Sequence, residues 1–322
     1  MPVVLSESLL GRRVVVRYRR PECDAHPPLS DVVGELIAFT GDGKATIAAR
    51  RGLVHIPLSD IVLARPIAYD RGQILALELT ASRGWRPATE VMRDGWLYRL
   101  DRGWTGRANS VLPVQPPSRP LGEMLDQARA AYTAEGLDLQ IQIPLGARDQ
   151  LDVDLARRGF LLARPTAVMT RRIDPPGPTR SVRSSRGPEV EVALGNEPTD
   201  DWLAAYHYRG EQLPSYAVEL LRRHDNVRFA AAWSAGRVVA VARGAVDGGW
   251  LGVTAIEVDS GFRRQGIAHR LMAALTDWGQ SAAALHCYLQ VDLANSAALA
   301  LYERLGFTEH HRYHYRIAPR LQ

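Results

Sequence analysis

Residues 250–302 constrain the fold most, because strand and helix patterns follow one another there in a fixed order. The apolar run Trp250–Val258 predicts a buried strand, and it leads into a turn at Gly266 where a helix is expected to begin. Glycine removes a Cβ where backbone must approach a ligand, and the start of a helix presents unpaired N–H groups to an anion. This stretch therefore predicts an anion-binding turn between a buried strand and a helix.

Two motifs mark this turn and a later helix. The turn reads R-R-Q-G-I-A from Arg263. Farther along, a strand pattern over residues 286–291 precedes a helix pattern that reads N-S-A-A-L-A-L-Y-E-R-L-G-F from Asn295. The first motif resembles the Q/R-x-x-G-x-G/A signature of the GNAT superfamily of acyl-CoA N-acyltransferases, and the second resembles its N-x-x-A-x-x-L-Y-E-x-x-G-F element. The turn alone also fits an ordinary strand-to-helix connection, but here both motifs stand in the superfamily's order and spacing.

The resemblance implies an α/β (α+β) fold and direct transfer of an acetyl group from acetyl-CoA to an amine in a ternary complex. In the superfamily the strand at residues 250–258 carries a bulge that separates it from the next strand, and a backbone N–H near Val258 polarises the thioester carbonyl. The turn cradles the pyrophosphate of coenzyme A. The cofactor-binding residues implied in this way are Ile256, Val258, Arg263, Arg264, Gln265, Gly266, Ile267, Ala268 and Asn295.

The reaction itself predicts a base and an acid. A lysine-like amine has a pKa of about 10.4, so near neutral pH it must lose a proton before it attacks a thioester. Glu257, on the strand expected beside the acetyl group, can accept that proton directly or through water. The resemblance implies that Tyr302 protonates the departing thiolate. The alternatives are a solvent-facing or ion-paired carboxylate at Glu257 and a packed helix tyrosine at Tyr302, while Asn295 can cap its helix, bind the pantetheine arm, or do both.

The first 66 of the 322 residues have a separate β pattern. Several short strands with turns between them predict a small barrel, similar to the SH3-like barrels that other bacterial proteins place before a GNAT domain. The strands are expected over residues 12–19, 31–39, 44–49 and 53–57, with a hairpin turn at 40–43 and a closing strand at 58–63.

The middle of the chain looks like a degenerate copy of the C-terminal unit. The segment L-A-R-R-G-F at residues 155–160 and the segment Y-E-R-L-G-F at 302–307 each precede a strand pattern. The first copy has prolines at residues 113–120, where a phosphate would need N–H groups, and it has Leu155 in place of Tyr302. This arrangement resembles actinobacterial tandem GNAT proteins. We expect an SH3-like barrel at 1–66, a degenerate GNAT-like unit at 70–173, a Pro- and Ser-rich linker at 174–188 and a catalytic GNAT domain at 189–322.

The acceptor site is expected between two helices, at residues 199–211 and 216–223, and the first copy. Residues 104–111 resemble a motif in the degenerate half of the tandem proteins, which would form a wall of the acceptor pocket; a strand with a polar turn is the alternative. The aromatic candidates can equally belong to the core. The predicted substrate-binding residues are Trp202, Tyr206, Tyr208 and Asn109, and they do not distinguish a small-molecule amine from a peptide amine.

The composition indicates which partners and which cellular compartment to expect. The net charge of +5 comes from dispersed arginines, with Lys44 as the single lysine and no long basic run, so a nucleic-acid partner is not favoured. No run reaches the ~20 apolar residues of a membrane span, the first residues do not read as a signal peptide, and two cysteines are too few for a disulfide framework. A cytoplasmic protein of undetermined oligomeric state is expected.

Two groups of reactive side chains are assigned to the fold rather than to chemistry. Cys287 is expected to be a core thiol, and His310, His311 and His314 do not complete a metal-ligand set. Two functions of other classes stay open: a non-catalytic acyl-CoA sensor or interaction module, and a nucleic-acid-associated protein that uses the barrel.

Overall fold

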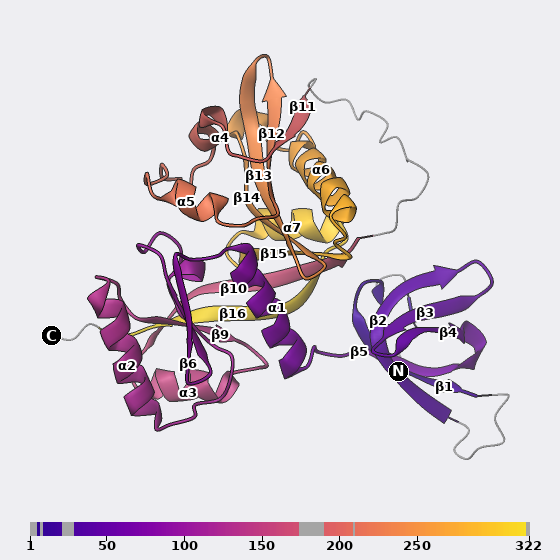
Figure 1. Cartoon of the computed structure of the whole chain (residues 1–322). Coiled ribbons are helices and arrows are strands. Elements are labelled where there is room, and N and C mark those ends of the chain that lie inside the picture. Colours follow the sequence, from indigo (N-terminus) through magenta and orange to yellow (C-terminus); the bar gives the residue numbers. More distant parts are fainter. Residues whose placement is uncertain (1–4, 7–8, 21–28, 174–189, 209, 320–322) are drawn as a thin grey trace.

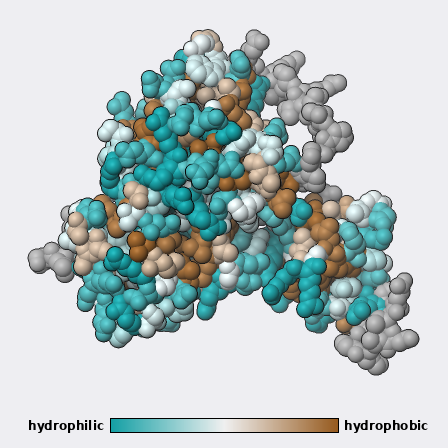
Figure 2. Space-filling view, in the orientation of Figure 1, coloured by the Kyte–Doolittle hydropathy of each residue, from teal (hydrophilic) through white to brown (hydrophobic). Residues whose placement is uncertain are grey.

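The structure is a computed structural model that describes residues 5–6, 9–20, 29–173, 190–208 and 210–319. The predicted linker at 174–188 lies outside the described residues. The chain forms a small N-terminal sheet and, beside it, a much larger sheet with helices on both faces (Figure 1). No described helix is long and apolar enough to cross a membrane. Figure 2 shows hydrophilic residues over most of this face, with hydrophobic residues in separate patches.

The N-terminal sheet has five antiparallel strands in the order β4-β3-β2-β1-β5. Its core includes Val14, Leu36, Ile47 and Ile56, all fully buried. Residues 58–60 form a 3₁₀ turn instead of strand, and β5 then pairs with β1. Within the described residues no pairing joins β4 to β5, so the predicted closed barrel is wrong and the sheet stays open. The strands are β1 (Arg13–Arg19), β2 (Leu29–Thr40), β3 (Lys44–Ala49), β4 (Gly52–Pro57) and β5 (Ile61–Pro66).

The middle of the chain and the C-terminal part repeat a strand–helix–strand–helix–strand order. In each, a parallel strand pair flanks a helix, a second helix follows, and a long strand ends the unit. The middle elements are α1 (Arg71–Gly84), β6 (Thr89–Arg93), β7 (Trp96–Leu100), β8 (Val111–Pro113), α2 (Leu121–Ala134), β9 (Gln140–Pro144), α3 (Asp149–Arg157) and β10 (Leu161–Arg172). The C-terminal elements are β11 (Glu191–Gly195), α4 (Asp200–Ala205), α5 (Ala217–Arg222), β12 (Val227–Ser234), β13 (Arg237–Asp247), β14 (Trp250–Val258), α6 (Ile267–Ser281), β15 (His286–Asp292), α7 (Ser296–Arg304) and β16 (Thr308–Ile317).

The two copies exchange their last strands. The large sheet runs β11-β12-β13-β14-β15-β10-β16-β9-β8-β7-β6. Strand β10, which ends the first copy, pairs with β15 of the second, and β16, which ends the second copy, pairs with β9 of the first. The copies therefore share one continuous sheet of eleven strands instead of having one sheet each.

Two helices shape the surroundings of the site. Helix α1 begins with a capping box at Asp70, and its Leu77 and Ala81 pack against tyrosines of the shared sheet. Helix α4 stops at Ala205, so residues 206–208 leave the helix instead of continuing it to residue 211. In Figure 1, α6 and the pair α4 and α5 lie on opposite sides of strands β12–β14.

Candidate active site

Strand β14 separates from β15 at a bulge. The two strands pair in parallel only over residues 250–253, and Ala255 then adopts a positive φ of 52° where the register with β13 shifts. A cavity of about 300 Å³ opens between the strands, and we call it the transfer cleft. Its walls come from the end of β14, from β15, from α7 and from residues 206–208. The bulge and separation expected from the motif are confirmed.

Tyr302 lines the transfer cleft from α7. Its side chain is buried, and its ring lies edge-on to Phe307 with centroids 6.0 Å apart. Burial raises the pKa of Tyr302 to about 12, so the phenol keeps its proton at neutral pH. Asn295 caps the same helix, because its Oδ1 accepts the Ala298 N–H at 3.1 Å, and both residues also line the cleft.

Glu257 also lines the transfer cleft, from the end of β14. It is half-buried, and its Oε2 accepts a 2.7 Å hydrogen bond from the His207 backbone N–H. It forms no ion pair within the described part of the chain. The same carboxylate also lines a second, larger cleft of about 500 Å³ that leads past Val258 to Arg263. Glu257 thus stands between the transfer cleft and the start of the glycine turn.

The turn before α6 has the open backbone that the motif predicts. Gly266 is exposed with a φ of 78°, and no atom lies within 4 Å of the place where a Cβ would sit. Arg263 and Gln265 hold the turn together, since Arg263 Nε donates to Val258 O and Gln265 Nε2 donates to Gly261 O, each at 3.1 Å. Of the residues after Gly266, Ile267 is buried in the core. The space beside Gly266 at the start of α6 is therefore open, as an anion site requires.

In the first copy, a side chain fills the gap between β8 and β9, which corresponds to the gap between β14 and β15. Strands β8 and β9 pair at one position only, and the buried Arg148 occupies the gap beyond it. Its Nε donates to Pro113 O at 2.8 Å, and a second nitrogen donates to Val114 O. Leu155, at the position of Tyr302, is fully buried. The first copy thus uses its own arginine to satisfy the carbonyls that separation of the strands exposes.

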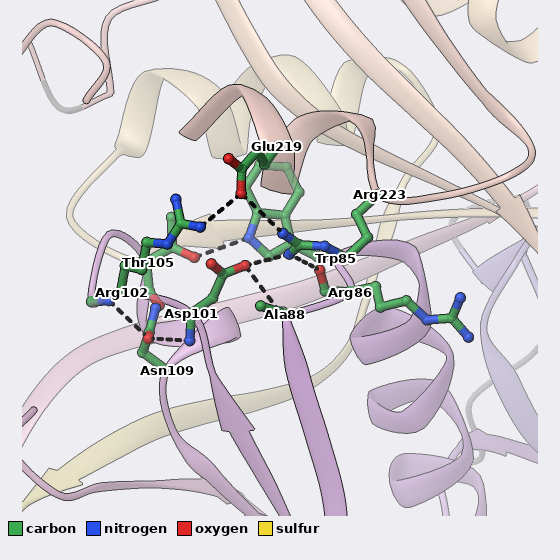
Figure 3. A network of polar contacts seen from close by, with 10 residues as sticks. Trp85, Arg86, Ala88, Asp101, Arg102, Thr105, Asn109, Glu219 and Arg223 are labelled. Atoms are coloured by element: carbon green, nitrogen blue, oxygen red, sulfur yellow. Dashed lines mark hydrogen bonds and ion pairs between the residues drawn. The ribbon is translucent and has the colours of Figure 1, made fainter. Parts of the chain in front are cut away.

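The loop over residues 101–109 is fixed by a buried polar network (Figure 3). Asn109 Oδ1 accepts the N–H groups of Asp101 at 2.7 Å and Gly103 at 2.9 Å. Asp101 also pairs with Arg223 of the second copy, at 2.5 Å, and Trp85 Nε1 donates to Thr105 Oγ1 nearby. Asn109 itself is only 1 % exposed, and it lines neither the transfer cleft nor the adjoining cavity between the two copies. Its predicted place in the acceptor pocket is therefore wrong, and it shapes the loop instead.

The aromatic candidates divide into two groups. Trp202 is 1 % exposed, donates its indole N–H to Ala230 O at 3.0 Å, and does not line the cavities described here, so it is a core residue. Tyr206 and Tyr208 do line the transfer cleft, because α4 ends before them and the chain turns toward β14. The ring of Trp104 contacts both, with centroids 6.5 and 5.3 Å away.

A second chamber continues the transfer cleft toward the first copy. This inter-copy chamber, of about 170 Å³, shares Arg107, Tyr208, Gln290 and Asp292 with the cleft. Its remaining walls come from the 101–109 loop and from the exchanged strands β10 and β16. Gly106 and Arg107 belong to the 104–111 motif, which the sequence predicts to line the acceptor pocket. Sequence reasoning missed the other residues of these walls, because they carry no motif of their own; they are Arg164, Thr166, Tyr313 and Tyr315.

The remaining cysteine and histidine candidates are buried, paired or stacked within the fold. Burial raises the pKa of Cys287 to about 12, which keeps it a thiol in the core. His311 pairs with the buried Glu78 at 2.8 Å, and His314 pairs with Asp152 at 2.6 Å. His310 stacks on Tyr69 at 3.5 Å, and burial lowers the pKa of this histidine to about 2.

Comparison with known proteins agrees with this geometry. The family described as "Probable histone acetyltransferase Rv0428c C-terminal" matches residues 71–316, and its "N-terminal Sm-like domain" matches residues 8–65. The chain belongs to this acetyltransferase family. The Mycobacterium tuberculosis protein named "Probable histone acetyltransferase Rv0428c" is 31% identical over 316 residues, which cover 95% of this chain and 94% of that protein.

Solved structures show the same GNAT fold at low identity. A GCN5-related N-acetyltransferase from Kribbella flavida aligns with a TM-score of 0.58 at 18% identity, over 78% of this chain and 96% of that one. A tandem GNAT protein from the clavulanic acid biosynthesis pathway aligns with a TM-score of 0.55 at 13% identity, over the same shares. The chain is thus a tandem-type member of the GNAT acetyltransferases with an Sm-like N-terminal domain. The finer likeness of that domain to SH3-like barrels stays a prediction.

Proposed function

We propose that the protein transfers an acetyl group from acetyl-CoA directly to an amine in a ternary complex. The observation that carries this proposal is the transfer cleft, which both Glu257 and Tyr302 line beside the separated strand β14. The pantetheine arm would lie between β14 and β15 against Asn295, and the pyrophosphate would meet the first N–H groups of α6. The buried hydroxyl of Thr254, which has no hydrogen-bond partner among the described residues, would gain one from the bound thioester.

The proposed roles follow from charge and position. Glu257 takes the ammonium proton, the amine nitrogen attacks the carbonyl carbon, and a backbone N–H near Ile256 or Val258 stabilises the oxyanion. The C–S bond then breaks, Tyr302 gives its proton to the thiolate, and the second proton that the nitrogen loses on becoming an amide restores the Tyr302 phenol through solvent. Because burial raises the pKa of Tyr302 to about 12, the phenol still carries its proton when the thiolate forms.

The direct test is release of free thiol from acetyl-CoA in the presence of a panel of amines. The panel includes free amino acids, polyamines and lysine peptides, since the Mycobacterium tuberculosis relative is named as a histone acetyltransferase. Turnover with any amine supports the proposal. Tight acetyl-CoA binding without transfer to any acceptor would instead support the non-catalytic acyl-CoA sensor.

Glu257→Gln is expected to lower kcat/KM by about 10²–10⁴-fold at neutral pH, because the general base is lost while the amide oxygen can still accept the His207 N–H. The deficit should shrink as pH rises toward the amine pKa of about 10.4, since more acceptor is then already unprotonated. The measurement is a pH series of thiol release. Glu309→Gln removes a carboxylate from the exposed part of β16 and serves as control. An unchanged pH profile in Glu257→Gln would show that the base lies elsewhere.

The proposal includes the division of the chain into an N-terminal domain at 1–66, a degenerate unit at 70–173, a linker at 174–188 and a catalytic domain at 189–322, in a cytoplasmic setting.

Deleting residues 1–66 is expected to leave a folded protein that binds acetyl-CoA with unchanged affinity. The N-terminal sheet has its own core, and its polar contacts with the rest include single bonds such as Thr308 Oγ1 to Gly11 O at 3.2 Å. Circular dichroism and calorimetry measure the outcome. Insolubility or loss of binding would mean that this sheet completes the catalytic core.

A further inference from the structure

The inter-copy chamber concentrates positive charge at the inner end of the transfer cleft. Arg107 lies at the junction of the two cavities, and Arg164 lines the chamber beyond it. The Arg164 side chain reaches the loop that carries Arg107, because one of its terminal nitrogens is 3.2 Å from the ideal Cβ position of Gly106. Within the described residues neither guanidinium forms an ion pair, and Asp292 is the one carboxylate among the chamber's wall residues. The chamber thus has two fixed cations and one anion.

Both guanidinium groups are held in place by rings rather than by carboxylates. Arg107 lies over the ring of Trp85 at 4.7 Å, and Arg164 lies over the ring of Tyr315 at 4.4 Å. The hydrogen bonds from Arg107 to Gln290 and from Arg164 to Gln140 use only part of the five N–H donors of each group. The Arg164 Nε atom is buried without a hydrogen-bond partner in the described structure. Rigid planar donors of this kind match the oxygens of a carboxylate or phosphate.

The backbone at Arg164 has an unusual conformation that fits its place in the chamber wall. Arg164 has a φ of 49° and precedes Pro165, inside a bulge where the pairing of β10 with β16 is interrupted. A positive φ is unfavourable for a residue with a Cβ, and such strain is retained mainly at functional sites. The bulge turns the strand so that Arg164 reaches the chamber.

The geometry points to an acceptor that carries an anionic group, a carboxylate or a phosphate, in addition to its amine. Its anionic end would bind Arg107 and Arg164 in the inter-copy chamber, while its amine would extend past Tyr208 to Glu257 in the transfer cleft. The phosphates of CoA are assigned to the turn at Gly266, and this turn is not among the chamber's wall residues. This inference rests on the proposed function, which it extends by naming the class of acceptor.

The experiment compares matched amines that differ only in the anionic group. The probes are Nα-acetyl-lysine and its carboxamide, then phosphoethanolamine and ethanolamine, and a lysine-rich peptide. Calorimetry with CoA-loaded protein measures binding, and thiol release from acetyl-CoA measures transfer. We expect the wild-type chain to prefer the anionic member of at least one pair by about 10- to 100-fold, the effect of one or two charge-assisted hydrogen bonds. The pair that responds distinguishes a carboxylate from a phosphate.

Arg164→Met should abolish this preference, and Arg164→Lys should retain part of it because charge remains without the planar fork. Arg228→Met is the matched control: Arg228 is also half-buried and lies over an aromatic ring, Trp278 at 5.3 Å, but it lines neither the cleft nor the chamber. The preference should survive in this variant. If Arg164→Met does not fold, Arg107→Lys tests the same point, with a reduced preference expected.

The outcomes separate this inference from the proposed function. Binding that depends on Arg164 without acetyl transfer would support the anionic site and contradict the transferase proposal. Transfer to neutral amines or to the lysine-rich peptide as efficiently as to anionic ones, unaffected by Arg164→Met, would overturn the anionic site and leave the transferase intact. Failure of every probe to bind the CoA-loaded protein would also overturn it.

Discussion

Tyr302→Phe is expected to lower kcat by about 10²–10⁴-fold while acetyl-CoA affinity changes little. The substitution removes only the hydroxyl and keeps the ring against Phe307, so folding should be spared. The pKa of about 12 means that the phenol carries its proton across the whole range of an ordinary pH profile, so the loss should be nearly independent of pH between about 6 and 9. Single-turnover thiol release measures the chemical step, and calorimetry measures binding.

A buried tyrosine outside the cleft provides the control for this prediction. Tyr98 is 2 % exposed in the core of the first copy, and burial raises its pKa as well. Tyr98→Phe should therefore change kcat by less than about twofold. Wild-type turnover in Tyr302→Phe would mean that the residue is a packing tyrosine and that the thiolate takes its proton from water.

Gly266→Glu is expected to weaken acetyl-CoA binding by about 100-fold or more. The new side chain would place bulk and negative charge in the open space before α6, where the pyrophosphate is proposed to lie, and a loss of about 3 kcal/mol corresponds to this factor. Calorimetry of the wild type should show one acetyl-CoA site per chain. In the first copy Arg148 fills the gap between β8 and β9, which corresponds to the gap between β14 and β15 in the second copy.

Gly159→Glu is a matched control for the stability that is lost when glutamate replaces a glycine with a positive φ. Gly159 has a φ of 80°, close to the 78° of Gly266, and it also has no atom within 4 Å of an added Cβ, but it ends α3 in the first copy. Its replacement should lower stability by a similar amount and leave acetyl-CoA affinity unchanged. Two equivalent sites in the wild type, or normal binding in Gly266→Glu, would contradict the degenerate first copy.

The local elements of the site could be read from the sequence because short-range chemistry specifies them. The apolar run of β14, the glycine at a position with positive φ and the Asn295 cap each act within a few neighbouring residues, and each lies where the pattern predicts. Tyr302 then follows by helical spacing from Asn295 and points into the cleft. The pattern of the first copy likewise indicated the loss of a phosphate-binding turn.

The acceptor side depends on pairings between segments far apart in the chain, and no local pattern specifies these. Asn109 and Trp202 look like binding residues in the sequence, yet one satisfies the backbone of its own loop and the other fills the core. Arg107 lies within the motif at residues 104–111, whereas Arg164 carries no motif. They line the same chamber only because β10 and β16 change places in the shared sheet, which brings the end of one copy against the site of the other. The sequence by itself determined the part of the site proposed to bind acetyl-CoA, through local backbone geometry, whereas long-range strand pairing decided which side chains line the proposed acceptor side.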